Sequence, residues 1–305
     1  MNKKIKIAFF VVLLIGVIAT LILFIQTADI AVLNPKGMVA ARQRELILLA
    51  LGLSAIVVIP VFVMLGVFAW KYRETNHKAT YRPNWDSSKL LETIWWGIPC
   101  VIILILATVT WYTSHELDPF KALASTAKPL KVQVVALQWK WLFIYPDYKV
   151  ASVNVLPLPK DTPIDFDITS DAPMNAFWIP HLGSQVYAMS GMSMQLHLMA
   201  NEEGDYKGSS SNISGKGFAD MAFTARVMNR EGFNNWVYDV KKSAEGLDQV
   251  AYNELAKPSS VKNPTTFVLK KPDLYDSIIQ KYTAPADKMN HEAHQIMDMP
   301  GMEGM

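Results

Sequence analysis

Three long apolar stretches constrain the fold of this chain more than any other feature. A helix needs roughly 20 residues to cross the hydrocarbon core of a bilayer. Three segments are long enough, namely Ile5–Ile25, Leu46–Trp70 and Ile94–Thr113. With only 18% charged residues, the chain is too apolar for an ordinary soluble protein. We therefore expect a membrane protein with a transmembrane helical hairpin over residues 44–114.

The basic residues predict how these helices are oriented. The connection between the second and third stretches carries five of them: Lys71, Arg73, Lys78, Arg82 and Lys89. Connections rich in lysine and arginine stay in the cytoplasm. Everything after Thr113 is therefore expected outside the cytoplasm, in a multi-pass arrangement.

Residues 1–27 allow two interpretations. A basic start followed by an apolar run is typical both of a membrane anchor and of a cleaved signal peptide. The run is longer than the usual signal core of about 7–15 residues, and its end, FIQTADIAV, has no clear cleavage site. A retained anchor is the favoured interpretation, and a cleaved signal remains the alternative.

Residues 128–228 show a different pattern, which is typical of β-strands. Polar and apolar residues alternate along Lys131–Ala136, Ile164–Ile168 and Met194–Met199, as expected for half-buried strands. Proline and glycine punctuate these runs. Several short strands over about 100 residues predict an antiparallel β-sandwich.

After Val227 the pattern returns to helix. Asn229 can cap a helix that places four apolar residues on one face: Phe233, Trp236, Val237 and Val240. A second helix is expected over Leu247–Ala256. A third should start at Asp273 and turn Leu274, Ile278 and Tyr282 inward. Residues 229–284 thus form a small helical appendix, and the Met- and His-rich tail over 285–305 is predicted to be disordered.

Charge and cysteine content exclude several classes of function. A net charge of +2 without a clustered basic patch argues against a nucleic-acid partner. The single cysteine, Cys100, rules out a disulfide or a cysteine-based metal cluster within the chain. Its place in an apolar run is typical of a small packing residue.

Glu92 is the most informative charged residue, because it directly precedes the third apolar stretch. An acid at the first turn of a helix is favoured by the helix dipole. A carboxylate at the mouth of a membrane helix bundle is also typical of a proton donor. The residues alone leave both interpretations open.

Several segments resemble subunit II of haem-copper terminal oxidases. They are ETIWWGIP, QWKWLFIYP from Gln138 and IPHLGSQVYAMSGM from Ile179, and they occur in the order found in that family. The KPDLYDSIIQKY segment is similar to the bo-type ubiquinol oxidase branch. The resemblance implies a cupredoxin-like sandwich on membrane helices, with the sandwich on the periplasmic face of a bacterial cytoplasmic membrane. It also implies a catalytic subunit I that carries haems and a copper ion, with further small membrane subunits.

The branch of the family that oxidises cytochrome c holds a binuclear copper centre in this domain. Its ligands are two histidines, two cysteines, a methionine and a glutamate backbone carbonyl. The resemblance places these ligands at Asn175, Phe218, Ser210, Ser214, Met221 and Asn212 of this chain. A serine hydroxyl cannot replace a soft bridging thiolate, and phenylalanine cannot ligate a metal. The Asn212 change is the least informative, because a backbone carbonyl is the ligand there.

We therefore expect no metal in this domain, no cytochrome c partner, and ubiquinol as the electron donor of the complex. Met221 is expected to be a core residue. The resemblance also assigns Glu92 to the mouth of a proton channel. Trp139 and Trp141 match an aromatic segment near the electron-entry region, and they are expected to pack between this domain and the catalytic subunit. No cysteine for lipidation occurs over Ala28–Gly37.

These features predict a subunit of a quinol:oxygen oxidoreductase that has no activity in isolation. Three alternatives remain. The first is a cytochrome c oxidase subunit of the same fold, and the second is a purely structural scaffold. The third is a copper-handling membrane protein, because thioethers and imidazoles suit Cu(I). The tail residues that suggest it are His291, His294, Met297, Met299, Met302 and Met305.

Overall fold

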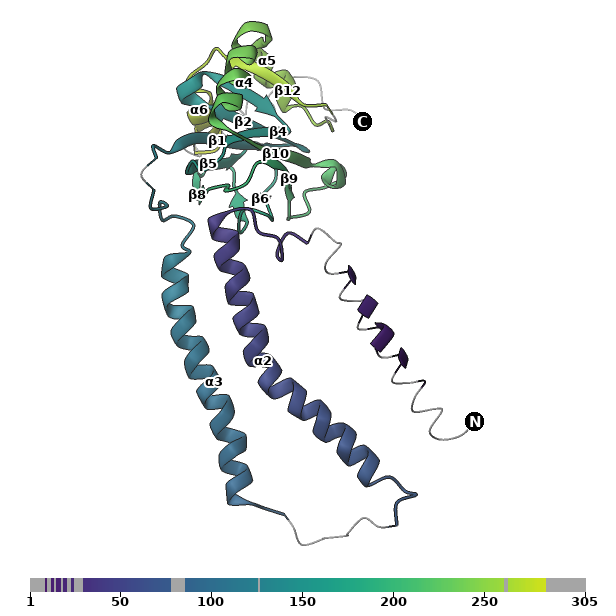
Figure 1. Cartoon of the computed structure of the whole chain (residues 1–305). Coiled ribbons are helices and arrows are strands. Elements are labelled where there is room, and N and C mark those ends of the chain that lie inside the picture. Colours follow the sequence, from purple (N-terminus) through teal and green to yellow (C-terminus); the bar gives the residue numbers. More distant parts are fainter. Residues whose placement is uncertain are drawn as a thin grey trace, which may run out of the picture. The chain divides into compact units, whose positions relative to one another are not determined.

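The computed structural model describes residues 30–77, 86–125, 127–260 and 263–283, with scattered residues between 9 and 24 (Figure 1). It divides into two compact units, one of residues 41–121 and one of residues 1–40 with 122–305. Most of the expected anchor over 1–27 and the whole tail over 285–305 lie outside the described residues, so both remain predictions.

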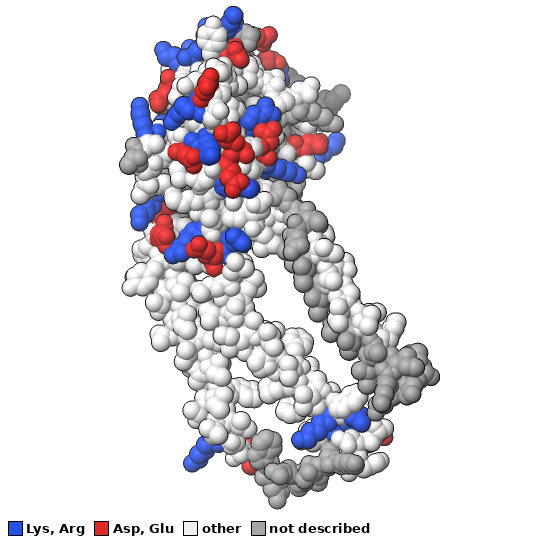
Figure 2. Space-filling model, viewed as in Figure 1, with Lys and Arg blue, Asp and Glu red and all other residues white. Residues whose placement is uncertain are grey.

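Two of the expected membrane segments are helices. α2 spans Met38–Lys71 and α3 spans Lys89–Glu116, and both are long and apolar enough to cross a membrane. Ser88 caps α3 by accepting a hydrogen bond from the Leu91 N–H group. Figure 2 shows no charged side chains along the middle of either helix. Their apolar side chains, including that of Cys100, are almost all exposed in the chain by itself.

The expected β-sandwich is also present, as one seven-stranded sheet and one five-stranded sheet. The larger sheet has the order β11-β12-β3-β2-β1-β5-β8, and the smaller has the order β4-β10-β9-β6-β7. The first five strands are β1 (Leu130–Leu137), β2 (Lys140–Tyr145), β3 (Val150–Val153), β4 (Val155–Pro159) and β5 (Ile164–Ser170). The next five are β6 (Asn175–Trp178), β7 (Val186–Ala188), β8 (Met194–Leu198), β9 (Gly204–Ser210) and β10 (Ala222–Met228). Two 3₁₀ turns, Pro146–Tyr148 and Phe218–Asp220, join strands.

Most strand pairs are antiparallel, as expected, but the sheets also contain parallel pairs. β1 pairs in parallel with β5, and β10 pairs in parallel with β4. Alternation of polar and apolar residues predicts that a strand exists and which face is buried. It carries no information on the direction of the neighbouring strand.

Aromatic side chains fill the core between the two sheets. Trp141, Phe143 and Tyr145 alternate along β2 and are all fully buried. The Phe177 and Phe223 rings stack with centroids 5.2 Å apart, and the Trp141 ring lies within 6 Å of both. Each buried ring of this size stabilises the fold by about 1.5–3 kcal/mol.

The described part of the carboxyl-terminal region, residues 229–260 and 263–283, contains three helices and two further strands. α4 (Arg230–Ser243) is capped by Asn229, which accepts a hydrogen bond from the Gly232 N–H group at 2.7 Å. α5 (Gln249–Ala256) and α6 (Leu274–Thr283) follow. The strands β11 (Glu245–Leu247) and β12 (Thr265–Leu269) join the seven-stranded sheet. Leu247 therefore ends a strand instead of starting a helix.

This region covers the outer face of the seven-stranded sheet with a second apolar core. Val135 and Leu137 of β1 point into it, whereas Val132 and Val134 point into the sandwich. Leu274 and Ile278 of α6 are buried there, as expected. Tyr282 was expected inward as well, but it is 40% exposed. Its hydroxyl donates to Asp171 instead, so a polar contact holds it at the surface.

The segment before α2 is hydrogen-bonded to the sandwich unit. The Lys36 N–H group donates to the His181 carbonyl at 2.8 Å, and the Lys36 carbonyl accepts from Asn201 at 2.8 Å. Gly37 forms a β-bridge with Ala200. A Cβ atom at Gly37 would lie 2.6 Å from the Met199 carbonyl oxygen, so no larger residue fits without a shift of the backbone.

We predict that Gly37→Ala destabilises the packing of residues 36–37 against the sandwich by about 1–3 kcal/mol, the usual range for overpacking. Thermal unfolding of the full chain in detergent would measure it. Gly52→Ala is the control, because a Cβ atom on that α2 residue would meet nothing within 4 Å. Equal unfolding temperatures for both variants and the wild type would contradict the prediction.

Candidate functional site

The positions matched to copper ligands gather at one end of the five-stranded sheet. Asn175 begins β6 and Ser210 ends β9, and these two strands pair in an antiparallel register. Asn212 and Ser214 lie in the loop that follows β9, and Met221 directly precedes β10. The fold thus brings together residues that are 35 positions apart in the sequence.

Hydrogen bonds between neutral groups hold this end of the sheet together. The Ser210 hydroxyl lies 3.1 Å from Asn175 Oδ1 and 3.0 Å from the Asn212 carbonyl oxygen. Its single hydrogen can serve only one of them at a time. The Ala176 N–H group donates to the same hydroxyl at 3.3 Å, and Asn175 Nδ2 donates to the Pro173 carbonyl at 2.7 Å. Asn175 and Ser210 are both buried. We call this set the Asn175–Ser210 network.

Met221 belongs to the same region but packs in the core. It is 1% exposed and is part of the main apolar cluster. The Ser214 hydroxyl lies 3.9 Å from Met221 Sδ. Phe218 is half-buried in the 3₁₀ turn, where its carbonyl accepts from the Met221 N–H group. The burial of Met221 in the core explains a methionine at this position without any metal.

These residues do not fit a copper centre. They offer hydroxyl and amide oxygens and one thioether, whereas paired copper ions need soft, anionic thiolates. Within the described part of the chain, no group of three or more His, Cys, Asp or Glu side chains could hold a metal ion.

Trp139 fastens the loop that follows β9. Its backbone is left-handed, with φ of 68°, and its indole N–H group donates to the Ser214 carbonyl at 3.2 Å. A Cβ atom on Gly217 would lie 2.3 Å from the indole ring, so the ring packs directly against the Gly217 backbone. Trp139 is half-buried, and its expected contact with another subunit remains a prediction.

The position of Trp141 contradicts the expectation that it packs against the catalytic subunit. Its side chain is fully buried and packs edge-on against the rings of Phe177 and Phe223. A residue in the core of this domain has no surface to offer to another subunit, so the expected intersubunit contact of Trp141 is wrong. The Trp139 backbone forms the turn between β1 and β2, and this turn separates the environments of the two tryptophans.

Glu92 lies in the first turn of α3 and is exposed. Its carboxylate accepts a hydrogen bond from the Ser88 N–H group at 3.4 Å. A surface depression beside it is lined by Asp86, Ser87, Ser88, Leu91, Glu92, Trp95 and Trp96. The carboxylate is thus at the positive end of the helix dipole and open to water.

Sequence reasoning missed two buried charged residues. Asp171, whose side chain is 1% exposed, follows β5 and accepts hydrogen bonds from α5 and α6. Burial alone would raise the pKa of Asp171, but the donors Lys281, Tyr252 and Tyr282 lower that pKa below its usual value. Lys140 donates to the Lys257 carbonyl at the end of α5 and to the Ser259 hydroxyl. Burial lowers the pKa of Lys140. Neither residue stands in a motif that would reveal its partners.

Family models match three parts of the chain. The transmembrane domain of cytochrome c oxidase subunit II matches residues 40–112, and the periplasmic domain of the same subunit matches residues 150–228. The COX aromatic rich motif matches residues 241–286. Membrane-type helices followed by this cupredoxin-like sandwich define the chain as a subunit II of the terminal-oxidase class.

Curated relatives narrow this class. Cytochrome bo(3) ubiquinol oxidase subunit 2 of Pseudomonas aeruginosa is 48% identical over 87% of this chain and 80% of its own length. The protein of the same name from Pseudomonas putida is 44% identical over 93% of this chain and 90% of its own length. Ubiquinol oxidase subunit 2 of Acetobacter aceti is 48% identical over 85% of both chains. The chain belongs to the ubiquinol oxidase subunit 2 family.

We predict that Ser210→Ala destabilises the sandwich by about 1–3 kcal/mol, because it leaves buried partners of the hydroxyl unsatisfied. Denaturant unfolding of the full chain in detergent would measure the loss. The neighbouring Ser209→Ala is the matched control and should change the free energy of unfolding by less than about 0.5 kcal/mol. A Ser210→Ala variant as stable as this control would refute a structural role for the network.

Proposed function

We propose that this chain is the non-redox subunit II of a proton-pumping terminal oxidase that passes electrons from ubiquinol to oxygen in an aerobic respiratory chain. One observation carries the proposal. Every side-chain ligand position of the copper centre except Met221 holds a residue that cannot serve copper, and the site is closed by hydrogen bonds instead. The names of the relatives support the same donor.

The proposed electron route bypasses this domain. Without a metal here, reduced cytochrome c has no acceptor on the chain. Ubiquinol is small and apolar, so it reaches the complex through the bilayer. The haems and a copper ion belong to the partner catalytic subunit in this proposal, and the isolated chain has no oxidase activity.

The two helices anchor the chain in this proposal. Their apolar side chains are exposed along both membrane-length windows, so the described part of the chain does not cover them. Arg42 bonds Glu116 at 3.2 Å and joins one end of α2 to one end of α3. We infer that the remaining surfaces are covered by the catalytic subunit, by other small membrane subunits and by lipid. The sandwich then lies on the periplasmic face of the cytoplasmic membrane.

In this proposal, Glu92 lies at the entry of a proton channel that leads into the catalytic subunit. Its carboxylate is exposed, lies at the predicted cytoplasmic end of α3, and is held by the Ser88 N–H group. A carboxylate in this position can take a proton from water and release it into a neighbouring channel. In a purely structural scaffold, the same acid would only stabilise the start of α3 through the helix dipole, so the two roles differ in whether turnover depends on the carboxylate.

We predict that Glu92→Gln slows oxygen consumption by the assembled oxidase about tenfold. This loss is smaller than the roughly 10²–10⁴-fold that a positioned proton donor contributes, because water near the exposed side chain replaces part of its role. Glu92→Asp keeps the carboxylate and should slow turnover less. The comparison is made on the purified complex with ubiquinol as the donor.

Glu74→Gln is the matched control, since Glu74 is an exposed acid in the connection that follows α2. It should leave turnover unchanged. Full turnover in Glu92→Gln, with normal assembly of the complex, would favour the scaffold role and refute the proton-channel role.

A further inference from the structure

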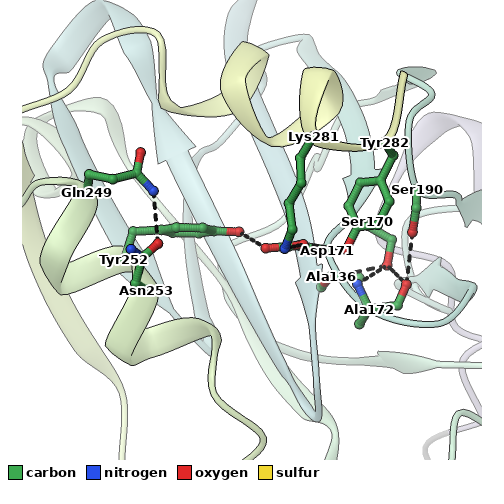
Figure 3. A network of polar contacts seen from close by, with 10 residues as sticks. All are labelled: Ala136, Ser170, Asp171, Ala172, Ser190, Gln249, Tyr252, Asn253, Lys281 and Tyr282. Carbon is green, nitrogen blue, oxygen red and sulfur yellow. Dashed lines mark hydrogen bonds and ion pairs between the residues drawn. The ribbon is translucent and has the colours of Figure 1, made fainter. Parts of the chain in front are cut away.

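The carboxylate of Asp171 is buried and accepts three side-chain hydrogen bonds within the described part of the sandwich unit. Tyr252 of α5 donates to Oδ2 at 2.6 Å. Lys281 and Tyr282 of α6 donate to Oδ1 at 2.7 and 2.6 Å. Figure 3 shows these three side chains directed at the carboxylate from the two helices. We call the four residues the Asp171 clamp. It ties the carboxyl-terminal segment, residues 245–283, to the end of β5.

Two further contacts hold α6 at the same end of the sandwich. The Tyr275 hydroxyl lies 2.9 Å from the Ser193 hydroxyl. A Cβ atom on Gly191 would lie 3.1 Å from Tyr282 Cβ, so the loop after β7 runs against the end of the helix. The clamp is therefore one part of a broad attachment.

The loop from Asp171 to Asn175 leads directly from the clamp to the Asn175–Ser210 network. The Ala172 carbonyl accepts from the Ser170 and Ser190 hydroxyls at 2.8 and 3.0 Å, as Figure 3 also shows. The Pro173 carbonyl accepts from Asn175 Nδ2. Hydrogen bonds thus accompany the chain from the clamp to the start of β6.

The far side of the loop is bonded to the segment after β9. Asn212 Nδ2 donates to the Met174 carbonyl at 2.8 Å, and the Ser211 N–H group donates to the Ala176 carbonyl at 3.1 Å. Pro173 adds a fixed backbone angle within the loop. The 171–175 loop is therefore held between the carboxyl-terminal segment on one side and residues 210–212 on the other.

We propose that the carboxyl-terminal segment sets the conformation of the 171–175 loop through Asp171 and thereby stabilises the Asn175–Ser210 network. The two regions form one cooperative unit. Asp171 is a positioning residue in this unit, and it acts on Ser210 only through the loop. A charge-assisted hydrogen bond is about twice as strong as a neutral one. Loss of the Asp171 carboxylate should therefore loosen the 171–175 loop before it loosens the Asn175–Ser210 network.

Amide hydrogen exchange of the full chain in detergent tests the coupling. Asp171→Asn replaces an acceptor of three donors with an amide, and it should speed exchange about tenfold in peptides that cover residues 172–178 and 210–214. Tyr252→Phe removes one donor and keeps the ring, so it should act in the same direction with a smaller effect. Asp276→Asn is the control, because this exposed α6 acid has no part in the clamp.

The combination with Ser210→Ala gives a second readout. If the clamp and the network are one unit, Ser210→Ala should speed loop exchange less in the Asp171→Asn background than in the wild type. Faster exchange confined to residues 274–283 would overturn the proposal, because it would mean that Asp171 holds only α6. If Asp171→Asn fails to fold, Tyr252→Phe decides, and unchanged exchange in the loop of that variant overturns the proposal equally.

Discussion

The hydrogen bond between Ser210 and Asn175 is the interaction on which the account of this domain depends. It joins the end of β9 to the start of β6, where side chains from distant parts of the sequence meet. Neutral groups suffice there because the Asn175 and Ser210 side chains bond one another and the neighbouring backbone. A chain closed in this way has no need of a metal at this end of the sandwich. The proposal that ubiquinol is the electron donor follows from these neutral side chains, which cannot hold the copper centre that cytochrome c would reduce.

The seven-stranded sheet explains why the carboxyl-terminal region is part of the domain. β1 and β2 bury apolar side chains on both faces, one against the smaller sheet and one under α5 and α6. Without that cover, the outer face of the sheet would expose a large apolar surface. β11 and β12 extend the same sheet, and Lys140 and Asp171 supply polar attachments at its ends.

Features set by local sequence were predicted well. Long apolar runs revealed α2 and α3, alternation revealed β1, β5 and β8, and Asn229 marked the start of α4. Features set by tertiary contacts were not. β11 has only three residues, too few for a period to show, and the TTFVL sequence of β12 does not alternate. The burial of Trp141, the outward position of Tyr282 and the partners of Asp171 depend on residues far away in the sequence. Likewise, the resemblance assigned the copper-ligand positions, but only the fold reveals the hydrogen bonds between Asn175 and Ser210.

Metal analysis of the full-length chain, separated in detergent from its purified complex, tests the central claim most directly. The account predicts no copper above trace level per chain, because Asn175, Ser210 and Ser214 offer only neutral oxygen and nitrogen atoms. Two copper ions per chain would contradict it. That result would mean that the protein is a subunit that accepts electrons from cytochrome c.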